Sequence, residues 1–131
     1  MSTGKQSMQD GEIVSKSIRE WQKEIHKLSR EKGWWDDPNR NVGEVLSLFH
    51  SEISEALEEY RTNHGPDIDY YFKVGSEHNP NKPEGFWIEI ADLLIRVFDF
   101  AEKYDVDLES LIDLKHEFNK SRPYRHGGKS A

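Results

Sequence analysis

Two pairs of acidic residues have a spacing that could bind a metal ion. Glu52 and Glu55 are three positions apart in one segment, and Glu89 and Asp92 have the same separation in another. Residues three apart lie on one face of an α-helix, so each pair presents two neighbouring carboxylates. Like charges this close repel. If the two pairs pack together, a divalent cation with oxygen ligands would neutralise their four charges, so the spacing predicts a metal site.

The segment of residues 86–104 supports this interpretation most strongly. It is apolar on nearly every side, and a three-four spacing places its polar residues in one narrow stripe: Glu89, Asp92, Arg96, Asp99 and Lys103. A solvent-facing stripe is normally broader. The pattern therefore predicts a helix buried by neighbouring helices and by a second copy of the chain, with its stripe facing a polar cleft.

The first acidic pair also has a simpler explanation. Glu52, Glu55 and Glu59 lie along one flank of an apolar stripe, and most runs of charge on a helix are solvated surface. Taken alone, this helix favours the solvated interpretation. The second pair, Glu89 and Asp92, shifts the balance towards a metal site.

Hydrophobic spacing predicts the four helices that position these residues. The expected segments are residues 12–32, residues 42–61, residues 86–104, and a last helix that follows Asp105 or Asp107 and ends at Pro123. Gly33 is expected to end the first helix, and Asn41 with Glu44 resembles a capping box for the second. The apolar stripe of the first helix, expected in the core, is Val14, Ile18, Trp21, Ile25 and Leu28.

Residues 62–85 lack helical periodicity, so we expect a long loop there, with a short strand at the aromatic residues 70–72. Whether this loop covers a site or contacts a partner chain stays open. A chain of 131 residues with 34% hydrophobic content has a modest core. We therefore expect an all-α bundle of about four main helices in one domain, residues 12–131, completed by dimerisation or tetramerisation, after a disordered N-terminus at residues 1–11.

The charge distribution limits the classes of partner. A formal net charge of −7 argues against stable binding to nucleic acid, and no signal peptide or membrane span is expected. The absence of cysteine fits a reducing cytoplasm. From Lys115 to Ala131 the chain carries five Lys or Arg and one Glu, against an acidic preceding part. An acidic body with a basic tail suits a small anion held between a metal and cations.

Two further groups of residues are candidates for ligand contacts. Trp34 and Trp35 follow the first helix, where packing against the helix end and stacking on an aromatic base both remain open. The last helix carries polar residues within its apolar face, namely Lys115, Asn119 and Arg122. The flexible tail adds Arg125, His126 and Lys129 beside two glycines, which is typical of a disordered terminus and equally suits close approach to an anion.

Three segments together resemble MazG-like all-α nucleoside triphosphate pyrophosphohydrolases. They read HSEISEALEEYR from His50, KPEGFWIEIADLLIR from Lys82, and KHEFNKSRPYRHGGK from Lys115. The resemblance runs in order from about residue 31 to the end. The first acidic pair alone is weakly specific, but its combination with the second pair and the basic ending is strongly specific.

The resemblance implies a helical bundle, usually dimeric, that uses Mg²⁺ to hydrolyse nucleoside or deoxynucleoside triphosphates to the monophosphate and pyrophosphate. Its metal ligands map onto Glu52, Glu55, Glu89 and Asp92, with Glu59 as an additional carboxylate. Ser51 stands where many members have a further Glu, which leaves the number of metal ions open. The polar residues of the last helix map onto Lys115, Asn119 and Arg122, which suit phosphate or base recognition.

Hard oxygen ligands favour Mg²⁺ or Mn²⁺, with Glu55 as the expected general base and Lys115 and Arg122 as stabilising cations. Two alternatives belong to other classes. A di-iron carboxylate bundle would require Glu-x-x-His pairs, which are absent at Glu52, Glu55 and Glu89. A non-catalytic nucleotide-binding or helical interaction module would bind its ligand without releasing pyrophosphate.

Overall fold

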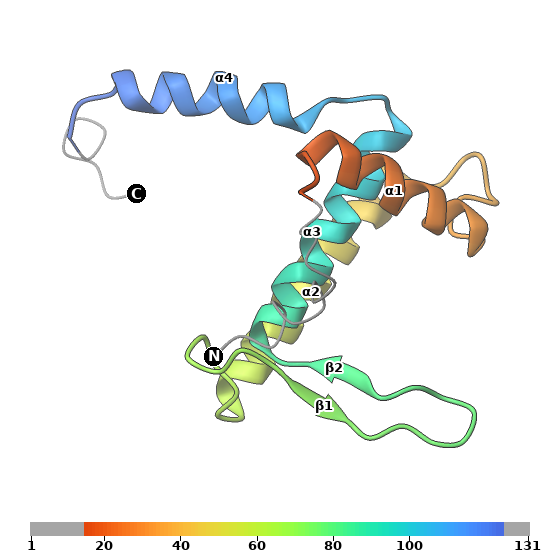
Figure 1. The fold of residues 1–131 in the computed structure, drawn as a ribbon. Coiled ribbons are helices and arrows are strands. Elements are labelled where there is room, and N and C mark those ends of the chain that lie inside the picture. Colours follow the sequence, from red (N-terminus) through yellow and green to blue (C-terminus); the bar gives the residue numbers. More distant parts are fainter. Residues whose placement is uncertain (1–14, 125–131) are drawn as a thin grey trace.

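The computed structural model describes residues 15–124, which form four helices and one small hairpin (Figure 1). The helices are α1 (Ile18–Glu31), α2 (Val42–Arg61), α3 (Phe86–Lys103) and α4 (Leu108–Ser121), and the strands are β1 (Tyr71–Lys73) and β2 (Lys82–Glu84). The predicted all-α fold with four main helices is confirmed. The predictions for residues 1–11, Arg125, His126 and Lys129 lie outside the described residues. None of the described helices is both long and apolar enough to cross a membrane.

A capping box sets the start of α1. The Ser17 side chain accepts a hydrogen bond from the Glu20 backbone N–H at 3.1 Å, and the Glu20 carboxylate accepts one from the Ser17 N–H at 2.7 Å. These bonds satisfy donors that have no partner within the helix. The predicted start near residue 12 is therefore wrong, because residues 15–17 are not helical and the cap decides the boundary.

The helices α2 and α3 form the centre of the fold. They run antiparallel and lie against one another, while α1 packs on α3 towards the end where α3 finishes (Figure 1). The rings of Phe49 and Phe100 meet edge to face between α2 and α3, with centroids 5.8 Å apart. Among the described residues, the buried apolar side chains are all small, namely Val45, Ala56 and Ala101. The acidic pairs therefore sit on two adjacent helices, as the metal hypothesis requires.

Many large apolar side chains remain exposed. On α2 they are Leu46, Ile53, Leu57 and Tyr60, and on α4 they are Leu111, Ile112, Leu114 and Phe118. Trp21 and Leu28 of α1, which were predicted to be core residues, are exposed as well. A protein that acts as a monomer normally covers such rows of apolar side chains.

The segment between α2 and α3 contains an antiparallel hairpin that projects from the helices (Figure 1). Its register pairs Tyr71 with Glu84, Phe72 with Pro83, and Lys73 with Lys82. The prediction of a short aromatic strand is confirmed by β1. The second strand was not predicted, because a sequence of Lys, Pro and Glu has low strand propensity.

The helix α4 leaves the bundle at a sharp corner and extends away from α2 and α3 (Figure 1). Its closest neighbour is α1. Gln22, which is 0% exposed, holds this corner: its amide nitrogen donates to the Val106 carbonyl at 2.7 Å, and its amide oxygen accepts from the Leu108 N–H at 3.0 Å. One buried polar side chain thus satisfies the backbone where α4 begins.

Candidate metal and substrate site

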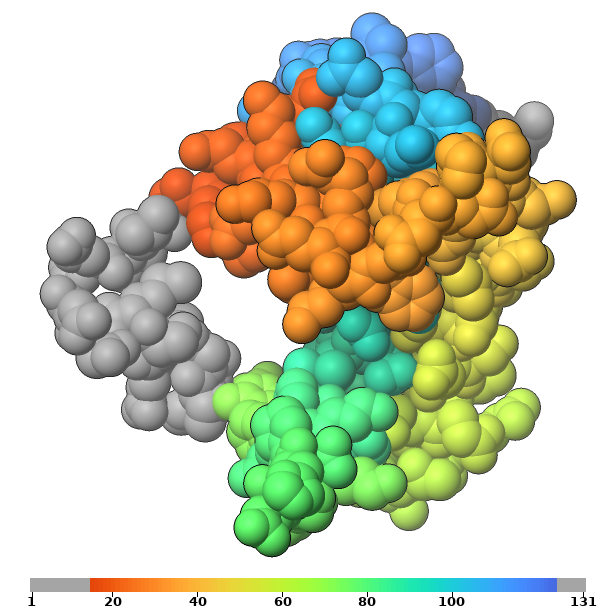
Figure 2. Space-filling model, turned by 90° about the vertical axis from the view of Figure 1, so that its right-hand side faces the viewer, coloured from red at the N-terminus to blue at the C-terminus, as the bar shows by residue number. Residues whose placement is uncertain are grey.

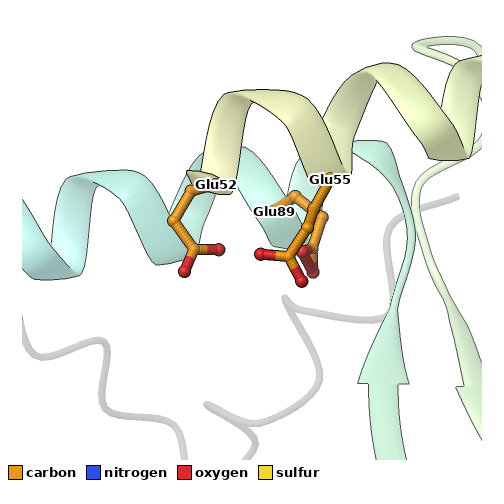
Figure 3. Close-up of side chains that lie close together, drawn as sticks. All are labelled: Glu52, Glu55 and Glu89. Atoms are coloured by element: carbon orange, nitrogen blue, oxygen red, sulfur yellow. The ribbon is translucent and has the colours of Figure 1, made fainter. Parts of the chain in front are cut away.

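Three of the four predicted metal ligands come together between α2 and α3. One oxygen from each of Glu52, Glu55 and Glu89 lies within 4.8 Å of the others. Figure 3 shows all three carboxylates extending from the same side of the helix pair, two from α2 and one from α3. Residue spacing places Glu52 and Glu55 on one face of α2, and the packing of α3 brings Glu89 opposite them.

Asp92 lies one turn beyond Glu89 on the same face of α3 but outside this group of three. Although Asp92 is exposed on the helix surface, loss of water around its carboxyl group raises its pKa, and the charge of Glu52 raises it further. Asp92 also lines the neighbouring pocket. It is therefore close enough to contribute to the site without joining the tightest cluster.

The crowding of carboxylates changes their protonation. Burial raises the pKa of Glu89 to about 7, and the charges of Glu55 and Asp92 add to the rise. Burial also raises the pKa of Glu55, and the neighbouring negative charge of Glu52 raises it further. A divalent cation would relieve this repulsion, and three carboxylates without nitrogen or sulfur ligands are a suitable donor set for Mg²⁺ or Mn²⁺.

Arg96 is part of this site, although no role in it was predicted for this residue. Its Nε donates to Glu52 Oε1 at 2.7 Å, and Glu52 is only 4% exposed. The ion pair compensates a buried negative charge that belongs to the cluster. Arg96 lies in the polar stripe of α3, so the spacing indicated its face of the helix but not its partner.

Glu59, considered as an additional carboxylate, belongs to a different contact. Its two oxygens accept the Tyr71 hydroxyl at 3.0 and 3.1 Å, and the His64 Nδ1 lies 3.6 Å from one of them. Burial raises the pKa of Tyr71 to about 12, and its bond to Glu59 adds to the rise. Glu59 therefore anchors the hairpin to α2 and is not one of the three clustered carboxylates.

An open pocket of about 670 Å³ lies beside the acidic cluster. Its walls come from α1, the loop after it and α3, including Trp21, Ile25, Leu28, Trp34, Arg40, Asp92, Ile95 and Arg96. Figure 2 shows α3 (teal) at the surface between α1 (orange) and the hairpin (green). Asp92 and Arg96 line the pocket and also act on the cluster, so the two features adjoin.

The two adjacent tryptophans have different surroundings. Trp34 is 54% exposed and lines the pocket. The Trp35 Nε1 donates to both oxygens of Asp99, at 2.9 and 3.0 Å, and Asp99 also contacts the Ser29 hydroxyl and His26 Nδ1, each at 2.7 Å. Trp35 therefore ties the loop to α3. Trp34 lies at the pocket with the guanidinium groups of Arg40 and Arg96 each 5.8 Å from its ring centre.

The predicted residues of the last helix lie elsewhere. Lys115, Asn119 and Arg122 belong to α4 and its C-terminal cap, where the Lys115 and Arg122 cations lie 4.8 and 5.6 Å from the Phe118 ring centre. Because α4 packs mainly on α1, one chain does not bring these residues to the acidic cluster.

Comparison with models of known protein families, with curated proteins and with solved structures gave no match. The cluster and the pocket are therefore the observations from which a function is inferred.

Proposed function

We propose that this protein hydrolyses nucleoside or deoxynucleoside triphosphates to the monophosphate and pyrophosphate in the presence of Mg²⁺. The observation that carries the proposal is an acidic cluster beside a pocket with an exposed aromatic wall. The cluster suits a cation that binds phosphate, and the pocket suits a flat base. Asp92 and Arg96 line the boundary between these two halves of the site.

Glu52, Glu55 and Glu89 would hold the metal, with Asp92 beside them. A bound Mg²⁺ would supply Lewis-acid chemistry, screening phosphate charge and making a water more acidic. Glu52 is fixed by Arg96, whereas Glu55 is exposed, so Glu55 is the better candidate to accept a proton from the attacking water. Trp34 would stack on the base and thereby position the phosphates at the cluster.

A panel of standard and modified nucleoside and deoxynucleoside triphosphates tests this function. Pyrophosphate release is measured with Mg²⁺, with Mn²⁺ and with a chelator. We expect pyrophosphate release that requires the metal. Nucleotide binding without any release would instead favour the non-catalytic module.

We further propose that a second copy of the chain covers the exposed apolar rows on α2 and α4. Burying such rows is favourable by roughly 25 cal/mol per Å², and α4 has little other packing within its own chain. The same association could bring the polar residues of α4 to a neighbouring acidic cluster. This arrangement accounts for a helix that projects from its own bundle.

Association gives the first prediction. Light scattering should show a mass at least twice the 15.4 kDa of one chain. Leu114→Asp should shift the protein towards the monomer, since Leu114 is 69% exposed in a single chain and a charge there harms only an interface. Asp113→Asn, at the adjacent position, is the matched control. A monomeric mass for the unaltered protein would contradict the proposal.

The tryptophans give the second prediction. Trp34→Ala should weaken nucleotide binding by about 1–3 kcal/mol while changing thermal stability little, because its ring would stack on the base and is 54% exposed. Trp35→Ala should instead lower the melting temperature, because it removes both hydrogen bonds to Asp99. The Michaelis constant and the melting temperature distinguish the two. The reverse pattern would show that Trp34 is the structural ring.

A further inference from the structure

Arg40 is a cation of the pocket that has no carboxylate partner among the described residues. It lies in the loop just before α2, is half-buried, and lines the pocket together with Trp34 and Arg96. Its one hydrogen bond within residues 15–124 is a donation from Nη1 to the Trp34 carbonyl at 3.3 Å. A guanidinium carries five N–H donors, so most of the Arg40 donors stay available to a ligand.

The two tryptophan rings hold Arg40 in place. Its guanidinium carbon lies 4.9 Å from the Trp35 ring centre, and Trp35 is itself bonded to both oxygens of Asp99. The same carbon lies 5.8 Å from the Trp34 ring centre, whereas direct stacking brings atoms to about 3.5–4 Å. Since Trp34 is also 54% exposed, ring surface remains for a base. Arg40 is therefore pre-positioned beside the ring on which the base would stack.

Arg40 lies at the end of the site that is remote from the acidic cluster. It lines a small cavity of about 20 Å³ together with Arg96 and Asp99. Asp99 is ten residues beyond Glu89 on α3, which corresponds to about 15 Å along the helix. If the phosphates are held by the metal at Glu89, the sugar and then the base extend towards Asp99. The Arg40 donors therefore face the base and not the triphosphate.

The other cations that line the pocket are less suited to base recognition. Arg96 donates to Glu52 at 2.7 Å, so its charge is already used at the cluster. Lys27 and Lys32 are exposed, and their flexible side chains do not fix the direction of the ammonium. The Arg40 guanidinium presents its donors as a rigid fork, which matches two adjacent acceptor atoms.

We propose that Arg40 selects the base of the nucleotide by donating two hydrogen bonds to a 6-oxopurine, the class that contains guanine and hypoxanthine. This inference rests on the proposed function and names its substrate class. The O6 and N7 atoms of guanine are adjacent acceptors, whereas adenine has an amino donor in place of O6. A donor that faces another donor stays unpaired, so adenine is disfavoured. The pocket of about 670 Å³ is large enough for a purine.

The test is calorimetry on the full chain with Mg²⁺ and the α,β-imido analogues of dGTP and dATP, which are not cleaved at the proposed bond. The unaltered protein should bind the dGTP analogue about tenfold or more tightly than the dATP analogue. Arg40→Gln should reduce this preference to about twofold or less. The corresponding 7-deaza-dGTP analogue, which lacks the N7 acceptor, should bind the unaltered protein more weakly than the dGTP analogue does. This ligand-side comparison does not depend on how the variant folds.

Arg30→Gln is the matched control, because Arg30 is exposed on α1, does not line the pocket, and loses the same charge. It should keep the preference of the unaltered protein. Equal loss of affinity for both analogues in Arg40→Gln, with the preference unchanged, would overturn the assignment by indicating a structural or general electrostatic role. Equal affinity of the unaltered protein for the dGTP and 7-deaza-dGTP analogues would overturn it as well.

These outcomes are distinct from the test of hydrolysis. If the preference for guanine depends on Arg40 but no triphosphate on the panel releases pyrophosphate, the base contact stands and the proposed hydrolysis fails. If pyrophosphate is released but the unaltered protein binds the dATP analogue as tightly as the dGTP analogue, hydrolysis stands and the role of Arg40 is overturned. Absence of binding by either analogue also overturns the role of Arg40.

Discussion

Replacing Glu55 with Gln should lower pyrophosphate release by about 100-fold or more, while the helical content stays unchanged. The substitution keeps the shape of the side chain but removes a charge from the three-carboxylate cluster and the proposed proton acceptor. Glu55 is exposed, and its negative charge is repelled by that of Glu52. Loss of the Glu55 charge should therefore not unfold the protein. The turnover number at saturating Mg²⁺ and the far-ultraviolet circular dichroism measure the two effects.

Glu58→Gln is the matched control for this experiment. Glu58 belongs to the same helix, but it is exposed, is not one of the three clustered carboxylates, and pairs loosely with Arg61 at 3.9 Å. Its substitution should leave turnover within about twofold of the unaltered protein. Unchanged turnover in Glu55→Gln would remove Glu55 from both of its assigned roles.

Glu89→Gln should stabilise the metal-free protein at neutral pH. The pKa of Glu89 is about 7 in the folded chain, against an ordinary value of 4.5. Below the ordinary value the group is protonated in both states. As pH rises from there through about 7, the folded state keeps a proton that the unfolded state has lost, so the stability contributed by that proton is progressively lost. The full loss is at most about 3 kcal/mol, and solvent screening reduces it.

Urea unfolding in the presence of a chelator measures this pH dependence. The midpoint for the unaltered protein should fall across that window more than the midpoint for Glu89→Gln. Added Mg²⁺ should raise the midpoint of the unaltered protein and have less effect on the variant, which lacks one proposed ligand. Parallel pH profiles for the two proteins would contradict the role of Glu89, and Glu58→Gln again serves as the control.

The helices could be predicted because their signals are local. Gly33 follows the end of α1 with a φ of +87°, a left-handed conformation that glycine adopts easily. Asn41 caps α2 by accepting from the Glu44 N–H, and of the two predicted caps for α4 it is Asp107 that accepts from Glu109. Strand β2 was not predicted, because it pairs with a strand on the other side of a turn and its residues have low strand propensity.

The site was predictable to the extent that helix periodicity determines it. Helical spacing was enough to place Glu52 and Glu55 on one face of α2, whereas the packing of α3 on α2 brings Glu89 opposite them. The separate roles of Trp34 and Trp35 were not predictable, because they depend on Asp99, which lies 64 residues from Trp35 in the chain. Contacts between residues so far apart in the chain depend on how the helices pack, which cannot be read directly from one sequence.

The buried Gln22 amide has a consequence at the far end of α4. Its bonds fix only the first turn of a helix of 14 residues, which is about 21 Å long. If α4 tilted by about 10° about that first turn, its C-terminal end would move by about 4 Å, which is more than the length of a hydrogen bond. A small change in the direction of α4 at its first turn therefore produces a large displacement of Arg122. The direction of α4 therefore depends on contacts of its first turn, namely the Gln22 amide and the hydrogen bond that the Ile18 N–H donates to the Glu109 carboxylate at 2.9 Å.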